Sequence, residues 1–254
     1  MNEEDIGMKF AKIKNENNPK LDKIISIESD KNKVKNFIEE IKLNTDFEVI
    51  QQIPPDKDRR CLYITGQSGS GKSVFTFKYA EEYRKKFKNN PIYLFSSVDK
   101  DILDKIKGLK RVKLDDKFLN ECNIGDLDFS NSLFIFDDTD VLANKFIKKK
   151  VDELLNILLQ KGRHSYSSVC FTSHQPNAGR ETKIILSESH SITFFPLTLG
   201  NRALKYLLES QFGYSTKQIN NIRRKCANSR WITIYKPNIV MYEKGIFITK
   251  PEDL

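Results

Sequence analysis

Cysteine is scarce in this chain, and the cysteines that it has lie far apart. Its 254 residues include 4 Cys, with no Cys-x-x-Cys pair and no Cys/His cluster. The spacing of disulfide-rich secreted proteins and of zinc fingers is therefore missing. Cys61 and Cys170 stand in apolar runs and are expected to be small core residues. We expect a reducing compartment and no structural zinc.

Long hydrophobic runs are also missing. No stretch approaches the ~20 consecutive apolar residues that a membrane helix needs. The first residues, MNEEDIGMKFAKIK, lack the apolar core of a secretion signal. We therefore expect a soluble protein without a membrane span.

Charge, by contrast, is abundant and unbalanced in sign. The chain has 43 Lys and Arg against 34 Asp and Glu, a net charge of +9, and 39% hydrophobic residues. Its length and apolar fraction suffice for one large α/β domain. The positive charge is typical of nucleic-acid-binding proteins, but a lysine-rich surface from an AT-rich genome gives the same balance. Basic stretches at 107–113, 145–150 and 223–225 are accordingly either phosphate contacts or solvated faces.

Residues 1–55 are polar and mixed in charge, and we predict that they form an N-terminal extension packed on the main domain. Periodicity predicts an amphipathic helix over 30–43 and a strand over 45–53, which Pro54-Pro55 ends. The first ~25 residues are expected to be mobile.

Residues 56–254 are predicted to form one α/β domain in which strands and helices alternate. Strands are predicted at 61–65, 91–98, 111–114, 132–137, 168–173 and 191–195, and helices at 72–87, 101–107 and 151–161. This alternation predicts a doubly wound, mainly parallel sheet with helices on both faces. Beyond Pro196 we predict helices at 202–211 and 216–227, a strand at 231–235 and a hairpin over 240–249.

A phosphate loop follows the first of these strands. Its sequence, Gly66-Gln67-Ser68-Gly69-Ser70-Gly71-Lys72-Ser73, fits G-x-x-x-x-G-K-[ST] at every fixed position. The glycines let main-chain amides close around phosphate oxygens at a helix N-terminus, which adds partial positive charge. Lys72 is expected to neutralise the β- and γ-phosphates, and the Ser73 hydroxyl to ligate Mg²⁺. The sequence therefore predicts a site for ATP with Mg²⁺.

An apolar strand that ends in two acids is the second motif, Leu133-Phe134-Ile135-Phe136-Asp137-Asp138. The carboxyl ends of parallel strands open onto the ligand crevice of such sheets. Asp137 is therefore expected to hold Mg²⁺ through water, and Asp138 to be the base that orients the attacking water. The alternative is that the acids only cap the strand end. Hydrolytic ATPases usually place the longer Glu at the second position.

The order of the two motifs favours one class of P-loop protein. At least one more strand, predicted at 91–98, separates the phosphate loop from the two acids. This is typical of RecA-like ATPases with a catalytic acid (the ASCE class), in which another strand lies between the two motif strands. Simple kinases and GTPases have those strands as neighbours. The GTPase base-reading motif Asn-Lys-x-Asp is absent from the sequence.

Two polar residues follow the predicted strand at 168–173. The amide of Gln175, at the strand end, is a candidate sensor of the γ-phosphate, and the alternative is a loop glutamine that faces solvent. His174 is expected to pack, because ATP hydrolysis does not need an imidazole here.

One arginine precedes the same strand. Arg163 is a candidate for the arginine that reaches the γ-phosphate of a neighbouring subunit, and we expect it near the catalytic edge of the sheet. An exposed helix C-cap is the alternative. Arg180 and Arg202 are the other candidates.

In combination these motifs resemble the FtsK–HerA superfamily, above all the poxvirus-type genome-packaging ATPases of large eukaryotic DNA viruses and their virophage relatives. The resemblance covers residues 58–250 and leaves the first 55 uncovered. It rests on the phosphate loop, the two acids, Gly162-Arg163-His164, Thr172-Ser173-His174-Gln175, and the strand at 230–234 that follows Phe194-Phe195-Pro196.

The resemblance implies a homo-oligomeric ring, a hexamer, that threads double-stranded DNA into a preformed capsid. In that family the second acid activates water, the glutamine senses the γ-phosphate and an arginine acts in trans, which correspond here to Asp138, Gln175 and Arg163. The implied partners are double-stranded DNA, further copies of the chain, and capsid or portal-vertex proteins. The implied location is the virion or the virus factory in the host cytoplasm.

Three other functions fit the same motifs. The first is an FtsK–HerA-like DNA motor for conjugation, segregation or repair, which shares the chemistry. The second is a nucleotide kinase, which needs an acceptor pocket and usually an Arg-rich lid. The third is a non-enzymatic, ATP-dependent assembly scaffold.

Overall fold

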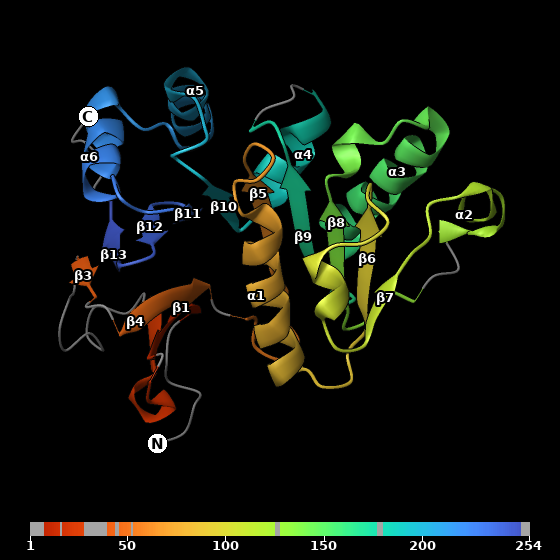
Figure 1. The fold of residues 1–254 in the computed structure, drawn as a ribbon, viewed down its shortest axis with the longest axis horizontal. Coiled ribbons are helices and arrows are strands. Elements are labelled where there is room, and N and C mark those ends of the chain that lie inside the picture. The colour runs from red at the N-terminus through yellow and green to blue at the C-terminus, as the bar shows by residue number, and fades with distance from the viewer. Residues whose placement is uncertain are drawn as a thin grey trace.

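A sheet in the order β3-β13-β12-β11-β10-β5-β9-β8-β6-β7 forms the centre of the molecule in the computed structural model (Figure 1). The structure describes residues 8–15, 17–27, 40–43, 46–51, 53–124, 128–176 and 180–249. Its strands are β1 (Met8–Asn15), β2 (Lys23–Ile27), β3 (Glu40–Lys42), β4 (Phe47–Gln51), β5 (Cys61–Thr65), β6 (Ile92–Ser96), β7 (Leu109–Arg111), β8 (Leu133–Asp137), β9 (Ser168–Ser173), β10 (Ser191–Phe194), β11 (Ile232–Tyr235), β12 (Ile239–Tyr242) and β13 (Gly245–Ile248). The helices are α1 (Lys72–Lys86), α2 (Asp116–Glu121), α3 (Lys145–Lys161), α4 (Arg180–Glu188), α5 (Asn201–Phe212) and α6 (Thr216–Lys225), with short 3₁₀ turns η2 (Pro19–Leu21), η4 (Ile102–Lys105) and η6 (Thr139–Val141).

The parallel half of the sheet has the predicted RecA-like order. Strands β10, β5, β9, β8, β6 and β7 are parallel. Strand β9 lies between β5, which precedes the phosphate loop, and β8, which ends in the two acids. The predicted α/β fold class is therefore confirmed. Beyond β10 the strands β11, β12, β13 and β3 pair antiparallel.

Helices cover both faces of this sheet, and this explains why its inner strands are apolar at successive positions. Alternate residues of a strand point to opposite faces. Cys61 and Tyr63 belong to a buried cluster that also contains residues of α2 to α6, whereas Leu62 and Ile64 belong to a second cluster with residues of α1 and η4. Every residue of β5 is buried. A continuous apolar strand is what burial on both faces requires.

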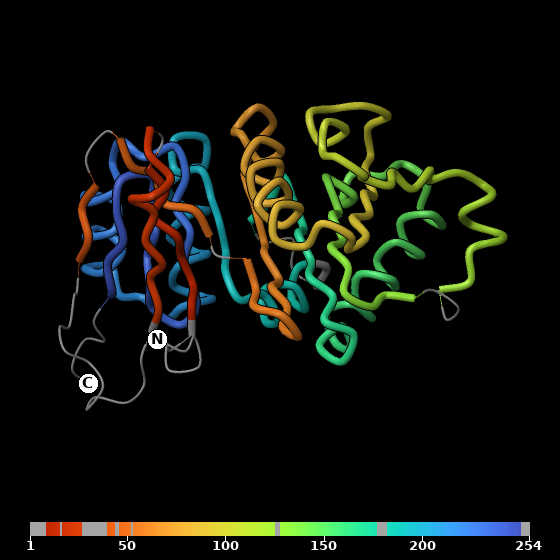
Figure 2. The backbone as a smooth tube through the Cα atoms, turned by 90° about the horizontal axis from the view of Figure 1, so that it is seen from below, coloured from red at the N-terminus to blue at the C-terminus, as the bar shows by residue number. Residues whose placement is uncertain are grey.

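The N-terminal residues form a second sheet in the order β2-β1-β4. Phe10 and Val49 of this sheet share a buried cluster with Tyr235, Met241 and Ile246 of the antiparallel strands. In Figure 2 the red N-terminal strands lie beside the blue C-terminal ones. The mobility expected for the first residues is therefore wrong for the described part, because β1 pairs with two strands.

The predicted helix over 30–43 falls mostly outside the described residues. Its last residues, Glu40–Lys42, form β3 and pair with β13 of the main sheet. A boundary at residue 55 stays a prediction. Within the described ranges, no helix is both long enough and apolar enough to cross a membrane.

Smaller differences lie around the parallel strands. The segment predicted as a helix at 101–107 is a 3₁₀ turn, Ile102–Lys105, and the strand predicted at 111–114 lies earlier, at Leu109–Arg111. The sequence did not predict α2 or α4.

Candidate active site

The phosphate loop connects the carboxyl end of β5 to the N-terminus of α1. Gly71 caps that helix with a φ of 107°, and Gly69 has a φ of +75°. Both values lie in the left-handed region, which glycine enters at little cost. A Cβ built on Gly69 would meet nothing within 4 Å, so the loop is open there.

Gly66 is required for a different reason, which is close packing. Its amide donates to the Ser173 carbonyl at 3.1 Å, which ties the loop to the end of β9. A Cβ at this position would lie 2.6 Å from Ser70 Oγ and 2.9 Å from Phe195 Cδ2. Phe195 follows β10 directly and also lies beneath Gly71. The loop therefore rests on an aromatic ring from the neighbouring strand.

Asp137 is a buried acid at the carboxyl end of β8. Its side chain accepts a hydrogen bond from Thr172 Oγ1, on β9, at 3.0 Å. Burial and, to a smaller extent, the neighbouring charges of Asp138 and Asp101 together raise the pKa of Asp137 to about 7. A buried carboxyl group of this kind is stabilised in its charged form by a cation.

Asp138, the next residue, has a left-handed backbone, with φ 50° and ψ 36°. Aspartate is one of the few residues that tolerate this conformation. Its amide donates to Thr172 Oγ1 at 2.9 Å, and its carboxylate lies 3.1 Å from the same oxygen. The turn directs the Asp138 carboxylate to the phosphate loop, where Oδ1 lies 3.4 Å from Lys72 Nζ.

Lys72 is buried, with its side chain only 5% exposed. The ammonium donates to the carbonyl of Gly66 at 2.9 Å, within the loop itself. His174 Nδ1 lies 3.4 Å from the same ammonium. The structure thus brings the phosphate loop and the acid pair together, as the motifs predict.

The packing role expected for His174 is wrong. Its Nε2 lies 3.1 Å from Asp138 Oδ2, so the ring contacts both the lysine and the second acid. The side chain of its neighbour Gln175 is exposed, and the described contacts of Gln175 are main-chain ones with Tyr63 and Ser173. The sensor role of Gln175 stays a prediction.

Sequence reasoning also missed Asp140. Its Oδ2 accepts from Ser173 Oγ at 2.7 Å and from the His174 amide at 3.4 Å, so it fixes the end of β9. Its other oxygen, Oδ1, is buried without a hydrogen-bond partner in the described part of the chain. The available signal was a third acid directly after the strand, in Asp137-Asp138-Thr139-Asp140.

Arg163 does not lie near the catalytic edge, and that expectation was wrong. Helix α3 runs back from the carboxyl end of β8 to the amino end of β9. Arg163 therefore lies at the amino ends of the strands, and the phosphate loop lies at their carboxyl ends. It is exposed there, beside residues that hydrogen-bond to the segment before β8. An action in trans stays a prediction. Arg180 and Arg202 begin α4 and α5, which follow β9 and β10 at the phosphate-loop edge.

The residues present fit a magnesium nucleotide. The Ser73 hydroxyl and the Asp137 carboxylate are hard oxygen ligands of the kind that Mg²⁺ takes, and water and phosphate oxygens complete its shell. Open space at Gly69, left-handed glycines and a buried lysine suit the phosphates. The phosphate loop and Asp137 lie at the carboxyl ends of β5 and β8, and β9 separates these two strands in the sheet.

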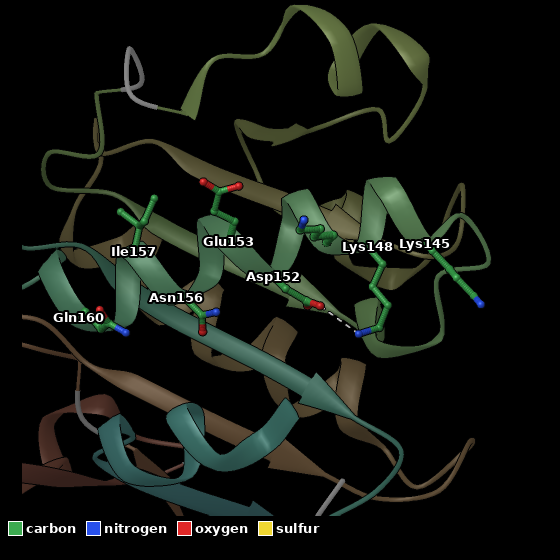
Figure 3. Close-up of a pocket in the computed structure, with 8 residues that line it drawn as sticks. Lys145, Lys148, Asp152, Glu153, Asn156, Ile157 and Gln160 are labelled. Carbon is green, nitrogen blue, oxygen red and sulfur yellow. Dashed lines mark hydrogen bonds and ion pairs between the residues drawn. The ribbon is translucent and has the colours of Figure 1, made fainter. Parts of the chain in front are cut away.

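A separate open groove of about 540 Å³ runs along α3 (Figure 3). Lys145 and Lys148 lie toward one end of the labelled row and Gln160 at the other, and Lys148 pairs with Asp152 at 3.0 Å. Phe146, in the first turn of α3, is 73% exposed. This end of the helix is basic, and no acid stands in its first turn.

Known proteins match both the sequence and the fold. A family model described as RNA helicase matches residues 62–149, which include the phosphate loop and both acids. Uncharacterized protein V3 of Sputnik virophage is 35% identical over 191 residues, which are 74% of this chain and 76% of V3.

Two solved structures share the fold at low identity. B204, the DNA-packaging ATPase of Sulfolobus Turreted Icosahedral Virus, matches with a TM-score of 0.51 and 16% identity, over 74% of this chain and 98% of B204. The pCW3 conjugation coupling protein TcpA, a monomer form with ATPγS, matches with a TM-score of 0.50 and 12% identity, over 87% of this chain and 69% of TcpA. The chain belongs to the same family as virophage protein V3, and it shares its fold with B204 and TcpA.

Proposed function

We propose that this chain is an ATP-hydrolysing DNA translocase that packages viral double-stranded DNA into capsids. The observation that carries the ATPase part is the meeting of Lys72, Asp137 and Asp138 at one sheet edge, with β9 between the two motif strands. The lysine proposed for the phosphates and the acid proposed for the water are in direct contact, with Lys72 Nζ 3.4 Å from Asp138 Oδ1. The packaging part draws on the fold shared with B204.

Each residue of the site has a distinct role in hydrolysis. The amides of residues 66–73 and the Lys72 ammonium bind the phosphates, and Ser73 and Asp137 hold Mg²⁺. When bound, the metal neutralises charge on the phosphate oxygens. Asp138 orients the attacking water and accepts its proton. Thr172 holds both acids from the adjacent strand.

Gln175 and Arg163 are also assigned roles in hydrolysis, although neither has a described side-chain contact with Lys72 or Asp138. Gln175 is the second residue after β9, at the end of the sheet where the γ-phosphate is expected, and we assign it the sensor role. Arg163 lies at the end of the sheet opposite the phosphate loop of its own chain, so it can act on a γ-phosphate only in a second subunit. A homo-oligomeric ring, a hexamer, supplies one. An arginine supplied by a second chain commonly stabilises the charge of the transition state in such enzymes.

DNA binding draws on charge. The chain carries a net charge of +9. Lys145 and Lys149 are exposed at the N-terminal end of α3, beside the exposed ring of Phe146. Cations at a helix N-terminus are disfavoured by the helix dipole, so an anionic partner offsets a local cost there. The proposed anionic partner is double-stranded DNA. The packaging role adds capsid or portal-vertex proteins as partners, and the virion or the virus factory of the host cytoplasm as the location.

The ATPase proposal is tested by turnover. Purified protein with Mg²⁺ and ATP should release phosphate, and double-stranded DNA should stimulate the release. Lys72→Ala and Asp138→Ala should each abolish it. Phosphate release that survives both substitutions would contradict the proposed site.

The DNA proposal is tested by filter binding as a function of salt. A protein that neutralises several phosphates loses affinity steeply as salt rises, with a slope of about −0.9 per phosphate contact. A shallow slope with weak binding would show that the +9 charge reflects composition alone.

A second candidate is an FtsK–HerA-like motor that moves DNA elsewhere, as in conjugation. The fold match to the coupling protein TcpA covers 87% of this chain and favours it. Immunodetection of the protein in purified virions separates the two functions. Its presence there supports packaging, and its absence supports the second candidate.

A further inference from the structure

His174 joins the lysine and the second acid of the site into one closed set of contacts. Its Nδ1 lies 3.4 Å from Lys72 Nζ and its Nε2 lies 3.1 Å from Asp138 Oδ2, while Lys72 and Asp138 lie 3.4 Å apart. A lysine ammonium only donates hydrogen bonds and a carboxylate only accepts them. Nδ1 must therefore be the acceptor and Nε2 the donor. The neutral ring with its proton on Nε2 satisfies both partners.

The contacts divide the two oxygens of Asp138. Oδ1 faces Lys72 and Thr172, whereas Oδ2 faces His174. A phosphate group that takes up the Lys72 ammonium competes with Oδ1 for it. It does not compete for the hydrogen bond on Oδ2. His174 is thus the partner of Oδ2 that nucleotide binding leaves in place, as Thr172 is for Oδ1.

The main chain around His174 is fixed on both sides. Ser173 donates through its hydroxyl to Asp140 and accepts from the Gly66 amide through its carbonyl. The His174 amide itself lies 3.4 Å from Asp140 Oδ2. The ring therefore stands on a strand end that is tied both to the phosphate loop and to the turn after β8. Its orientation is set before any ligand arrives.

We propose that His174 is a positioning residue that holds Asp138 Oδ2 while Lys72 turns to the phosphates, so that Oδ1 exchanges the lysine for the attacking water and keeps its contact with Thr172. The inference rests on the proposed function, in which Asp138 is the base. His174 forms no bond to substrate and transfers no proton. It couples the two motifs through hydrogen bonds that Asp138 and Lys72 cannot make with an apolar ring.

Three variants test this role by separating turnover from nucleotide binding. His174→Phe keeps a flat ring and removes both hydrogen bonds. His174→Gln keeps one acceptor and one donor on a flexible side chain. His164→Phe is the matched control, because His164 is exposed in the loop before β9, at the edge of the sheet away from the site.

We expect His174→Phe to lower kcat roughly 10- to 100-fold, the usual cost of removing a partner that orients a reacting group. The KM for ATP and the affinity for an ATP analogue should stay within about threefold, because the phosphate loop is intact. His174→Gln should restore most of the turnover, and His164→Phe should match the wild type.

Two results would overturn the inference. One is a kcat for His174→Phe equal to that of the wild type. The other is an equal loss of nucleotide affinity and thermal stability in both His174 variants, which indicates a merely structural role. Absence of ATP hydrolysis by the wild-type protein would instead contradict the proposed function, so the two failures are distinguishable.

Discussion

Asp138 Oδ1 lies 3.4 Å from Lys72 Nζ, so the acid assigned to water and the lysine assigned to phosphate form an ion pair with each other. The lysine end of the pair is buried, and the aspartate side chain is 21% exposed. A phosphate that binds Lys72 must compete with this carboxylate. The energetics of nucleotide binding and of hydrolysis are therefore opposed at one residue.

Asp138→Asn should separate these two effects. Loss of the competing charge should tighten ATP binding about fivefold, which corresponds to an ion pair of about 1 kcal/mol. Loss of the base should lower turnover by at least about 100-fold. Titration with a fluorescent ATP analogue and a phosphate-release assay measure the two. Asp128→Asn, at a solvent-facing position, is the control. Weaker ATP binding by Asp138→Asn would refute the competition.

Gly66→Ala should damage the phosphate loop through packing. The added methyl group would lie 2.6 Å from Ser70 Oγ and 2.9 Å from Phe195, so the loop or the ring must shift. We expect at least a roughly tenfold loss of ATP affinity, since a displaced loop misaligns its amides. Gly200→Ala is the matched control, because a Cβ there meets nothing within 4 Å. Equal affinities of the two variants would contradict the packing argument.

Arg59→Ala should destabilise the fold without touching the site. The buried guanidinium donates to the carbonyls of Leu158 at 2.7 Å and Leu159 at 2.8 Å, at the C-terminal end of α3. Its removal leaves buried carbonyls with fewer donors and should lower the free energy of unfolding by about 3 kcal/mol. Urea denaturation measures this. Lys161→Ala, which removes an exposed cation from the same helix end, should change little. An unchanged urea midpoint for Arg59→Ala would argue against the cap.

His190 should make the fold sensitive to acid. Burial lowers its pKa from 6.5 to about 4, with Arg60, Arg59 and Lys236 acting in the same direction and Asp58 opposing them. Its Nδ1 accepts from the Cys61 amide at 3.0 Å, which requires an unprotonated nitrogen. The unfolded chain therefore binds a proton that the folded chain does not, between these two pKa values.

The stability that His190 contributes is thus complete above about pH 6.5 and is lost as the pH falls through about 4. The expected loss is at most about 3 kcal/mol. Urea denaturation at several pH values measures it. His190→Gln should show a smaller decline over this window. An identical decline in wild type and variant would assign the acid sensitivity to other groups.

The sequence predicted the elements whose pattern is purely local. Strands β5 and β8 are continuous apolar runs that end in a polar residue, so burial on two faces left a clear signal in the sequence. The phosphate loop and the acid pair were placed correctly because their positions relative to a strand end decide their geometry.

Other elements show no clear periodicity of apolar residues in the sequence. In β1 the register shifts between Lys9 and Ala11, so Phe10 and Ala11 are both buried and the alternation expected of a strand is lost. Helix α2 is short and is built on an Asp115 cap, with a single buried residue, Phe118. Neither segment carries enough periodic apolar residues to be recognised.

The site residues beyond the motifs could not be ranked from sequence, because small geometric differences decide them. His174 and Gln175 are neighbours after one strand, and only the path of the chain determines which side chain faces Asp138. Arg163 was misplaced because its location depends on the direction in which α3 crosses the sheet. Contacts between distant segments set both outcomes.

Phe195 contacts both the phosphate loop and the segment that leads into α5. The ring supports Gly66 and Gly71, and the carbonyl of the same residue accepts from the amides of Thr198 and Leu199, just before α5. Close-packed contacts pass on a displacement instead of absorbing it. We therefore expect a movement of the phosphate loop to displace β10 and, through its pairing with β11, the antiparallel strands that pack against the N-terminal sheet.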